Sequence, residues 1–332
     1  FSIINPNRFD EENLFKDLAA VGVTFLFVMG LRKKLREKNF FVNNQEPNIL
    51  QYLDLVALGT VCDLVKLKNY NRAIIRKGIE ILHKRSNKGI AKIIDNSKIN
   101  HSPTVSDLGY IIGPQLNAGS RIDDSSLPSK ILTSENIVEI ESIARKLFIL
   151  NKKRKLIEIN IYEKAIDQIR NQSLNNVIIV KGKNWHHGVL GIVASKIVEK
   201  FNKPAIAISY NNNYGIGSAR SIANIDLGNI ILKAKQQGLL LSGGGHKMAA
   251  GLKISKDLIA DFENYIIDYF EKLRDYIDTA EKNVFTVKGL KKPLTAYLLY
   301  SKDQHQTNKG TEQWKKMDMG GQSKAISVSW KK

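Results

Sequence analysis

The sequence has few of the features that would place it in a membrane or outside the cell. Cys62 is the only cysteine among 332 residues, so an internal disulfide is impossible and a reducing compartment is expected. No apolar run reaches the roughly 18 residues that a transmembrane helix needs. The chain also opens without the segments of a signal peptide. These absences predict a cytoplasmic protein.

Acidic residues are scarce relative to basic ones. The chain has 32 Asp and Glu against 51 Lys and Arg, which gives a formal net charge of +19. Such an excess is larger than solubility requires and favours a polyanionic partner. The alternative is a proteome rich in lysine and asparagine, which would raise the charge of every protein. The length and the 43% hydrophobic content predict two or three globular domains.

The first third of the chain is predicted to be mainly helical. Leu18–Leu35 is apolar nearly all round, which favours a helix buried between layers. Asn71–Leu82 predicts a second helix with a basic exposed side. Between them, in Ile49–Leu67, Asp63 has apolar neighbours, and burying a carboxylate there is costly unless it is paired or binds a metal. A helix cap, a salt bridge and a metal ligand all remain open for Asp63.

Asp107–Asp124 is predicted to start as a helix and to continue as a loop rich in small and polar residues. Within it, Asn117 and Arg121 are candidate ligand-binding residues, because arginine is the usual bidentate partner of phosphate and carboxylate groups. Asp123 and Asp124 either hold that arginine or begin the next helix.

Ser134–Ile169 has helical spacing, dense charge and neither glycine nor proline. This pattern predicts one long helix that spans between two domains. The basic run Asn151–Lys155 within it is interpreted as a solvated face.

The second half begins with a strand, helix, strand pattern. Asn176–Val180 and Ala205–Ser209 predict strands, and Gly188–Phe201 between them predicts a helix. Trp185 and His186, followed by a second histidine, lie where the first strand ends, and ligands of α/β sheets commonly bind there. A metal site is a weak interpretation of the two histidines, since no third ligand has suitable spacing.

Gly215–Ile222 predicts a further strand or turn that carries Ser218, Arg220 and Ser221. Ser218 and Arg220 are two residues apart, so they project to the same side of an extended segment. A hydroxyl and a guanidinium on one side can clamp a phosphate.

Leu240–Leu252 combines glycines with polar residues that bind phosphate. It contains in order Gly243, Gly244, Gly245, His246 and Lys247. The glycines predict a turn with positive φ and close backbone approach to a ligand. The histidine can donate to a phosphate oxygen or transfer a proton. The alternative is a structural glycine loop with a solvated histidine.

Taken together, these motifs resemble the RecJ exonucleases of the DHH phosphoesterase superfamily. The resemblance covers about residues 1–273 and depends on motifs in the family's order, namely GTVCD, GPQLNAGSR, WHHGVLGIVAS, GSARS and SGGGHKMAAGL. It implies an α/β fold with a partial parallel-sheet DHH domain at residues 1–133 and a long helical segment at 134–172. A smaller α/β DHH-associated domain is expected at 173–275, followed at 276–332 by the start of an OB-like region and a disordered basic tail.

The resemblance also implies a chemistry, namely 5'-to-3' hydrolysis of single-stranded DNA in repair and recombination with two Mn²⁺ or Mg²⁺ ions. Asp63 would be a metal ligand in an acidic, otherwise apolar cleft, and His246 would be catalytic. Arg121, Ser218 and Arg220 would hold a 5'-terminal phosphate. The other expected substrate-binding residues are Asn117, Trp185, His186, Ser221, Gly243, Gly244, Gly245 and Lys247.

The sequence departs from the family in two respects. The other metal-binding aspartates and the Asp-His-His signature belong upstream of Phe1, and Gly119-Ser120 replaces an Ala-Gly pair. An incomplete metal site and an inactive fragment are therefore expected from these residues. Two alternatives to the exonuclease remain: a remnant that binds single-stranded nucleic acid, or a phosphoesterase of short oligonucleotides or cyclic dinucleotides.

Overall fold

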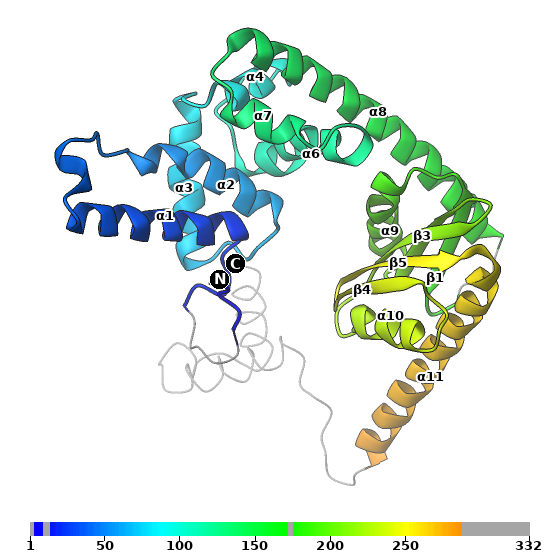
Figure 1. The fold of residues 1–332 in the computed structure, drawn as a ribbon. Helices are drawn as coiled ribbons and strands as arrows, with labels where there is room; N and C mark the ends of the chain where they lie inside the picture. The colour runs from blue at the N-terminus through cyan, green and yellow to red at the C-terminus, as the bar shows by residue number, and fades with distance from the viewer. Residues whose placement is uncertain (1–2, 9–13, 172–174, 287–332) are drawn as a thin grey trace, which may run out of the picture. The chain divides into compact units, whose positions relative to one another are not determined.

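The computed structural model describes residues 3–8, 14–171 and 175–286. In the described residues up to 171, all regular structure is helical (Figure 1). These elements are α1 (Ala20–Glu37), η1 (Phe40–Val42), η2 (Ile49–Tyr52), α2 (Leu53–Cys62), α3 (Asn69–His83), α4 (Lys88–Asn96), α5 (Val105–Asp107), the π-helical turn η3 (Leu108–Ile112), α6 (Gly113–Ile122), α7 (Leu127–Thr133) and α8 (Ile137–Arg170). The strands of the expected parallel DHH sheet are thus not among the described residues 3–133.

The helix predicted over Leu18–Leu35 is present as α1, but its predicted burial is wrong. Gly22 is the buried residue of this helix, while Phe27 is exposed. The reason is that α2 covers α1 on one side, where Val21 lies so close to Gly59 that a Cβ there would be 2.8 Å from a Val21 methyl group.

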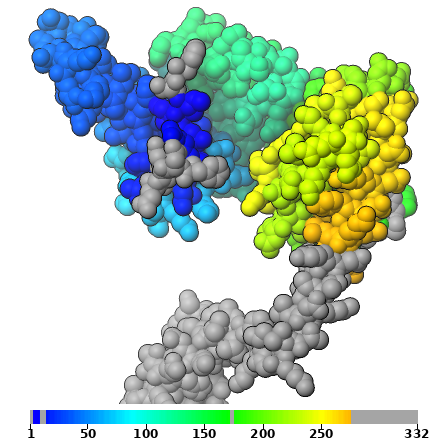
Figure 2. All heavy atoms as spheres, turned by 60° about the horizontal axis from the view of Figure 1, so that its bottom comes forward, coloured from blue at the N-terminus to red at the C-terminus, as the bar shows by residue number. Residues whose placement is uncertain are grey.

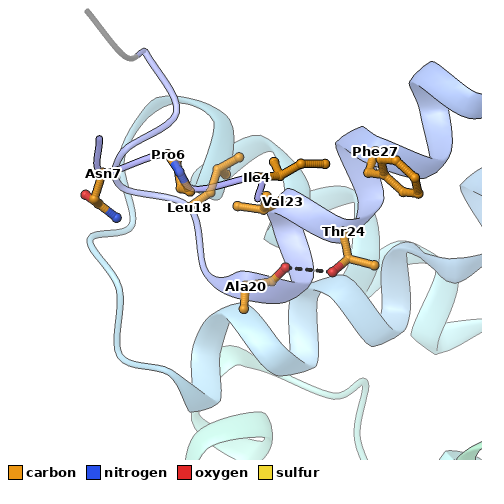
Figure 3. Close-up of a pocket in the computed structure, with 8 residues that line it drawn as sticks. All are labelled: Ile4, Pro6, Asn7, Leu18, Ala20, Val23, Thr24 and Phe27. Atoms are coloured by element: carbon orange, nitrogen blue, oxygen red, sulfur yellow. Dashed lines mark hydrogen bonds between the residues drawn. The ribbon is translucent and has the colours of Figure 1, made fainter. Parts of the chain in front are cut away.

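The exposed apolar surface of α1 includes an open pocket of about 640 Å³ (Figure 3). The preceding segment and α1 line it with Ile4, Pro6, Asn7, Leu18, Ala20, Val23, Thr24 and Phe27. The Thr24 hydroxyl is not available to the pocket as a donor, because it donates to the Ala20 carbonyl oxygen at 2.9 Å. The pocket is therefore mainly apolar.

The helical part has its own hydrophobic core. Its fully enclosed side chains include Ile93, Leu108, Ile112, Ile131 and Leu147. The loop predicted within Asp107–Asp124 is wrong, because η3 and α6 continue the helix to Ile122. Burial explains the error: alternate small and apolar residues of α6 pack against α8, and tertiary packing overrides a low helix propensity.

The long helix is confirmed as α8, which has 34 residues. It begins where the Asn136 side chain accepts hydrogen bonds from the backbone N–H groups of Val138 and Glu139. Its first half packs in the helical core and its second half packs against the sheet (Figure 1). The described residues up to Phe270 form one compact unit, so α8 joins its two cores.

The sheet contains five strands in the order β1-β2-β3-β5-β4. Its elements are β1 (Ile178–Lys183), α9 (His187–Phe201), β2 (Ala205–Tyr210), β3 (Tyr214–Arg220), α10 (Leu227–Gln236), β4 (Ser242–His246), β5 (Ala249–Ser255), η4 (Lys256–Leu258) and α11 (Ile259–Thr286). Only β1 and β2 are parallel, which confirms the predicted strand, helix, strand unit, and the other pairs are antiparallel. The chain is therefore an α/β protein, as predicted, and most strand pairs of its described sheet are antiparallel.

Two further expectations meet the limits of the described residues. Residues 276–286 of the expected OB-like region lie in the helix α11, and its remainder and the basic tail, from position 287 onward, lie outside the described residues. Among the helices of the described ranges, none is long and apolar enough to cross a membrane.

Candidate nucleic-acid interface

One face of the sheet is only partly covered by helices. α10 and α11 cover the face that carries Ala250, Leu252 and Ile254. On the opposite face, α8 and α9 cover β1 and β2, but β4 and β5 stay open, since a Cβ at Gly244 or Gly251 would meet nothing within 4 Å. The yellow atoms of β4 and β5 form part of the surface in Figure 2. A backbone of another molecule can therefore approach this face closely.

The glycines of β4 do not form the predicted turn. They are extended, and among the described residues the glycine with positive φ is Gly238. Gly243 and Gly245 are packed closely instead, because a Cβ at these positions would lie 2.9 Å from an Ile231 methyl group and 2.3 Å from the Ala249 carbonyl oxygen, respectively. Glycine thus fits here because two backbones approach each other, and no left-handed conformation is involved.

His246 ends β4 and is exposed, as is Lys247 after it. Its Nδ1 accepts a hydrogen bond from the Met248 backbone N–H at 3.3 Å, so the neutral ring carries its hydrogen on Nε2. In the sheet register His246 pairs with Ala249, which pairs with Arg220. Residues directly opposite one another point to the same face, so His246 and Arg220 share the open face.

Arg220 and Ser218 project to the same side of β3, as the spacing predicts. The Arg220 Nη1 donates to the Ser218 Oγ at 3.1 Å and to the Ala219 carbonyl oxygen at 2.9 Å. The guanidinium lies over α9 at Gly191, where a Cβ would be 2.7 Å from Arg220 Nη2. A residue without a side chain at Gly191 therefore makes room for Arg220.

Arg121 reaches the same turn of α9 from α6. Its Nη1 donates to the Gly188 carbonyl oxygen at 3.2 Å. Neither candidate aspartate holds it, because Asp123 pairs with Lys146 at 2.7 Å. Asp124 accepts instead from the backbone N–H of Ser126, just before α7. The second alternative, that these aspartates lead into the next helix, is the one observed for Asp124.

The two arginines carry like charges at one helix N-terminus. Burial and then the charge of Arg121 lower the pKa of Arg220. Burial also lowers the pKa of Arg121, followed by repulsion from Arg154, while Glu158 opposes the change. Repulsion between cations at the positive end of a helix is relieved when an anion binds there. The arrangement therefore suits a phosphate.

His186 caps this helix. Its Nδ1 accepts a hydrogen bond from the Gly188 backbone N–H at 3.2 Å. Burial, the neighbouring His187 and Lys153 lower its pKa, so the ring is neutral at neutral pH and the cap persists. Within the described ranges no three His, Cys, Asp or Glu side chains form a group that could hold a metal ion, and the two adjacent histidines are no exception.

Two predicted substrate-binding residues are used by the protein itself. Trp185 is buried in the core, where its indole covers Gly182. The hydroxyl of Ser221, also buried, donates to the Ile225 carbonyl oxygen at 3.0 Å. Direct contact of these two side chains with a ligand is therefore not supported, whereas Asn117 is exposed on α6 and available.

The predicted burial of Asp63 is wrong. Asp63 is the C-cap of α2 and is exposed, because the helix ends there and the chain leaves the core. The buried carboxylate of this helix is Asp54, whose pKa is raised by burial. Asp63 is an oxygen ligand of a kind that suits Mg²⁺ or Mn²⁺, but the described residues supply no ligand set around it.

A buried ionic network was missed in the sequence, where Asn151–Lys155 was interpreted as solvated. Arg154 is buried and donates to Glu158 at 2.5 Å, and Lys196 of α9 pairs with the other oxygen of Glu158 at 2.5 Å. The i, i+4 spacing of Arg154 and Glu158 is a signal that predicts the pair on a helix. Its burial depends on α9 and could not be read from that spacing.

Comparison with known proteins agrees with these features. The DHHA1 domain family matches residues 174–272. The single-stranded-DNA-specific exonuclease RecJ of Dickeya dadantii is 38% identical over 280 residues, which cover 80% of this chain and 48% of that protein. RecJ of Haemophilus influenzae is 35% identical over 288 residues, which cover 83% of this chain and 49% of that protein.

The chain is a homologue of the RecJ exonucleases. The solved structure of Thermus thermophilus RecJ in complex with Mn²⁺ agrees with a TM-score of 0.66 at 27% identity, over 76% of this chain and 36% of that one. The chain thus spans about half the length of the curated RecJ relatives named above.

Proposed function

We propose that this chain binds single-stranded DNA and holds its 5'-terminal phosphate at the N-terminus of α9. The observation that supports the proposal is the convergence of Arg121, Ser218 and Arg220 at one turn, with Arg121 on Gly188 and Arg220 on Gly191. Two guanidiniums and a hydroxyl beside the positive end of a helix dipole suit a phosphate monoester.

The open sheet face extends this site to the rest of the strand. Gly244 and Gly251 leave room for a sugar-phosphate backbone, while His246 lies in the same row as Arg220 with its Nε2–H available as a donor. We assign the glycines, Lys247 and Asn117 to backbone binding and His246 to the phosphodiester that is cleaved.

Within a whole protein of the RecJ type, this binding would serve 5'-to-3' hydrolysis of single-stranded DNA in repair and recombination, in the cytoplasm. Mn²⁺ and Mg²⁺, which Thermus thermophilus RecJ structures contain, would activate water and stabilise the leaving oxygen. Asp63 is proposed as a ligand of such an ion. The described residues form no complete ligand set for such an ion.

Binding of paired strands that differ only at the 5' end tests the proposal. Each charge-assisted contact contributes about 1.5–3 kcal/mol, so Arg220→Ala is expected to weaken binding of a 5'-phosphorylated oligonucleotide at least about tenfold. A strand with a 5' hydroxyl should change much less. Arg76→Ala, which removes an exposed arginine of α3, is the matched control. Equal losses of affinity for both strands would show that Arg220 contributes only general positive potential and does not bind the 5' phosphate.

Nucleotide release separates the exonuclease from its main alternative. The chain is incubated with Mn²⁺ and a labelled strand, with Asp63→Asn beside it. Release that depends on Asp63 supports the exonuclease. Tight binding without any release supports a module that binds single-stranded nucleic acid.

A further inference from the structure

The turn between β1 and α9 leads into the proposed phosphate site, and the end of β2 holds it in place. Asn184 opens this turn with a φ of 57°, a left-handed conformation that asparagine tolerates better than most residues. Its backbone N–H donates to the Tyr210 carbonyl oxygen at 2.9 Å. Because Tyr210 is the last residue of β2, the start of the turn is tied to that strand.

A side chain makes the second bond between β2 and the turn. The Ser209 hydroxyl donates to the Trp185 carbonyl oxygen at 2.6 Å, a short distance even for an O–H···O bond. Ser209 is half-buried. A serine hydroxyl has one hydrogen to donate, and here the Trp185 carbonyl accepts it, so Ser209 holds the turn and has no donor left for a ligand.

The indole of Trp185 fixes the same residue on β1. Trp185 is buried, and a Cβ at Gly182 would lie 2.0 Å from its Cε2 atom. Any larger residue at Gly182 would displace the ring. With its ring packed on β1 and its carbonyl bonded to β2, Trp185 has a position that depends on both strands.

The position of Trp185 determines where the partners of both site arginines lie. α9 starts two residues after Trp185. Arg121 donates to the Gly188 carbonyl oxygen, and Arg220 lies against Gly191. A shift of the turn would therefore move the contacts of both guanidinium groups at once.

We infer that Ser209 is a positioning residue for the 5'-phosphate site. Its hydroxyl fixes the Trp185 carbonyl, and the turn in this position holds Arg121 and Arg220 where one phosphate contacts both. Ser209 is uncharged, so it acts by geometry and adds nothing to the positive potential of the site. Binding groups must lie within about 0.5 Å of their productive positions, so a lost supporting bond has a measurable effect. The inference rests on the proposed binding of a 5' phosphate.

Substitutions of Ser209 test the inference through the ratio of affinities for a 5'-phosphorylated and a 5'-hydroxyl strand. Ser209→Ala removes the supporting bond and is expected to lower this ratio roughly two- to tenfold, the effect of one hydrogen bond. Ser209→Thr keeps the hydroxyl and should have the wild-type ratio. Ser129→Ala is the matched control, since its hydroxyl also donates to a carbonyl oxygen, that of Ser126, but at α7. It should leave the ratio unchanged.

Two further measurements separate positioning from a general loss of structure. Melting curves show how much stability each variant loses, and partial unfolding would weaken binding of both strands equally without changing their ratio. Because Ser209→Ala changes no charge, the slope of log affinity against log salt should stay that of the wild type.

Either of two results would overturn the inference while the proposed function stands. One is a wild-type ratio in Ser209→Ala when Arg220→Ala loses the preference for the 5' phosphate, because the turn would then need no support from Ser209. The other is a ratio that stays low in Ser209→Thr, because the hydroxyl would then not be the group that matters. If the wild-type chain shows no preference for the phosphorylated strand, the proposed function fails and the inference falls with it.

Discussion

At the scale of single residues, Glu158 balances two neighbouring cations, the buried Arg154 and the half-buried Lys196. Its carboxylate accepts from Arg154 and pairs with Lys196, and Arg154 is itself buried. Removing one partner of a buried pair leaves an uncompensated charge. We therefore expect Glu158→Gln to lower the free energy of unfolding by about 3 kcal/mol, measured by urea denaturation.

Glu163→Gln on the same helix is the matched control, since Glu163 is exposed and surface charges contribute about 1 kcal/mol or less. Equal stability losses in the two variants would show that the ionic network of Glu158 does not stabilise the fold.

At the scale of elements, the first turn of α9 sets the position of Arg220. A Cβ at Gly191 would lie 2.7 Å from Arg220 Nη2 and 3.1 Å from Ser218 Oγ, the ends of movable side chains. Alanine also raises helix propensity by about 1 kcal/mol over glycine. Gly191→Ala should therefore keep or raise the melting temperature while weakening binding of a 5'-phosphorylated strand several-fold.

The control for this element is Gly30→Ala in α1, where a Cβ would meet nothing within 4 Å. It should gain the same helix propensity without any change in binding. A Gly191→Ala chain that binds the phosphorylated strand as well as the Gly30→Ala chain would contradict the role given to the turn.

At the scale of the whole molecule, the net charge of +19 and the basic residues of the proposed binding site predict an affinity for single-stranded DNA that falls steeply with salt. If Arg121, Arg220 and Lys247 each contact a phosphate, the slope of log affinity against log salt should be about −2, at about −0.7 per contact for a single strand. Titrations at several salt concentrations measure it. A slope near zero would exclude these basic residues as the binding surface, and Arg76→Ala should leave the slope unchanged.

Local patterns in the sequence determined the long helix, the shared side of two site residues and the family resemblance. The 34 residues of α8 lack glycine and proline and need no partner to favour a helix. The two-residue spacing of Ser218 and Arg220 fixes a common side on any strand. The motifs from GTVCD to GGGHKMAAG sufficed to recognise the RecJ resemblance, because their order is a property of the chain itself.

Tertiary structure alone decided which of these residues are buried and which meet. Apolar residues of α1 such as Phe27 are exposed because α2 covers this helix on one side only. Asp63 is exposed because α2 ends there. The glycines of β4 are extended because they pair with β5, and α10 packs on the backbone of Gly245. Arg121 and Arg220 are 99 positions apart, and only the packing of α6 and β3 on the same turn of α9 brings them together. The burial of a residue and its contacts with distant parts of the chain depend on how all the elements pack together, and local spacing in the sequence does not encode that packing.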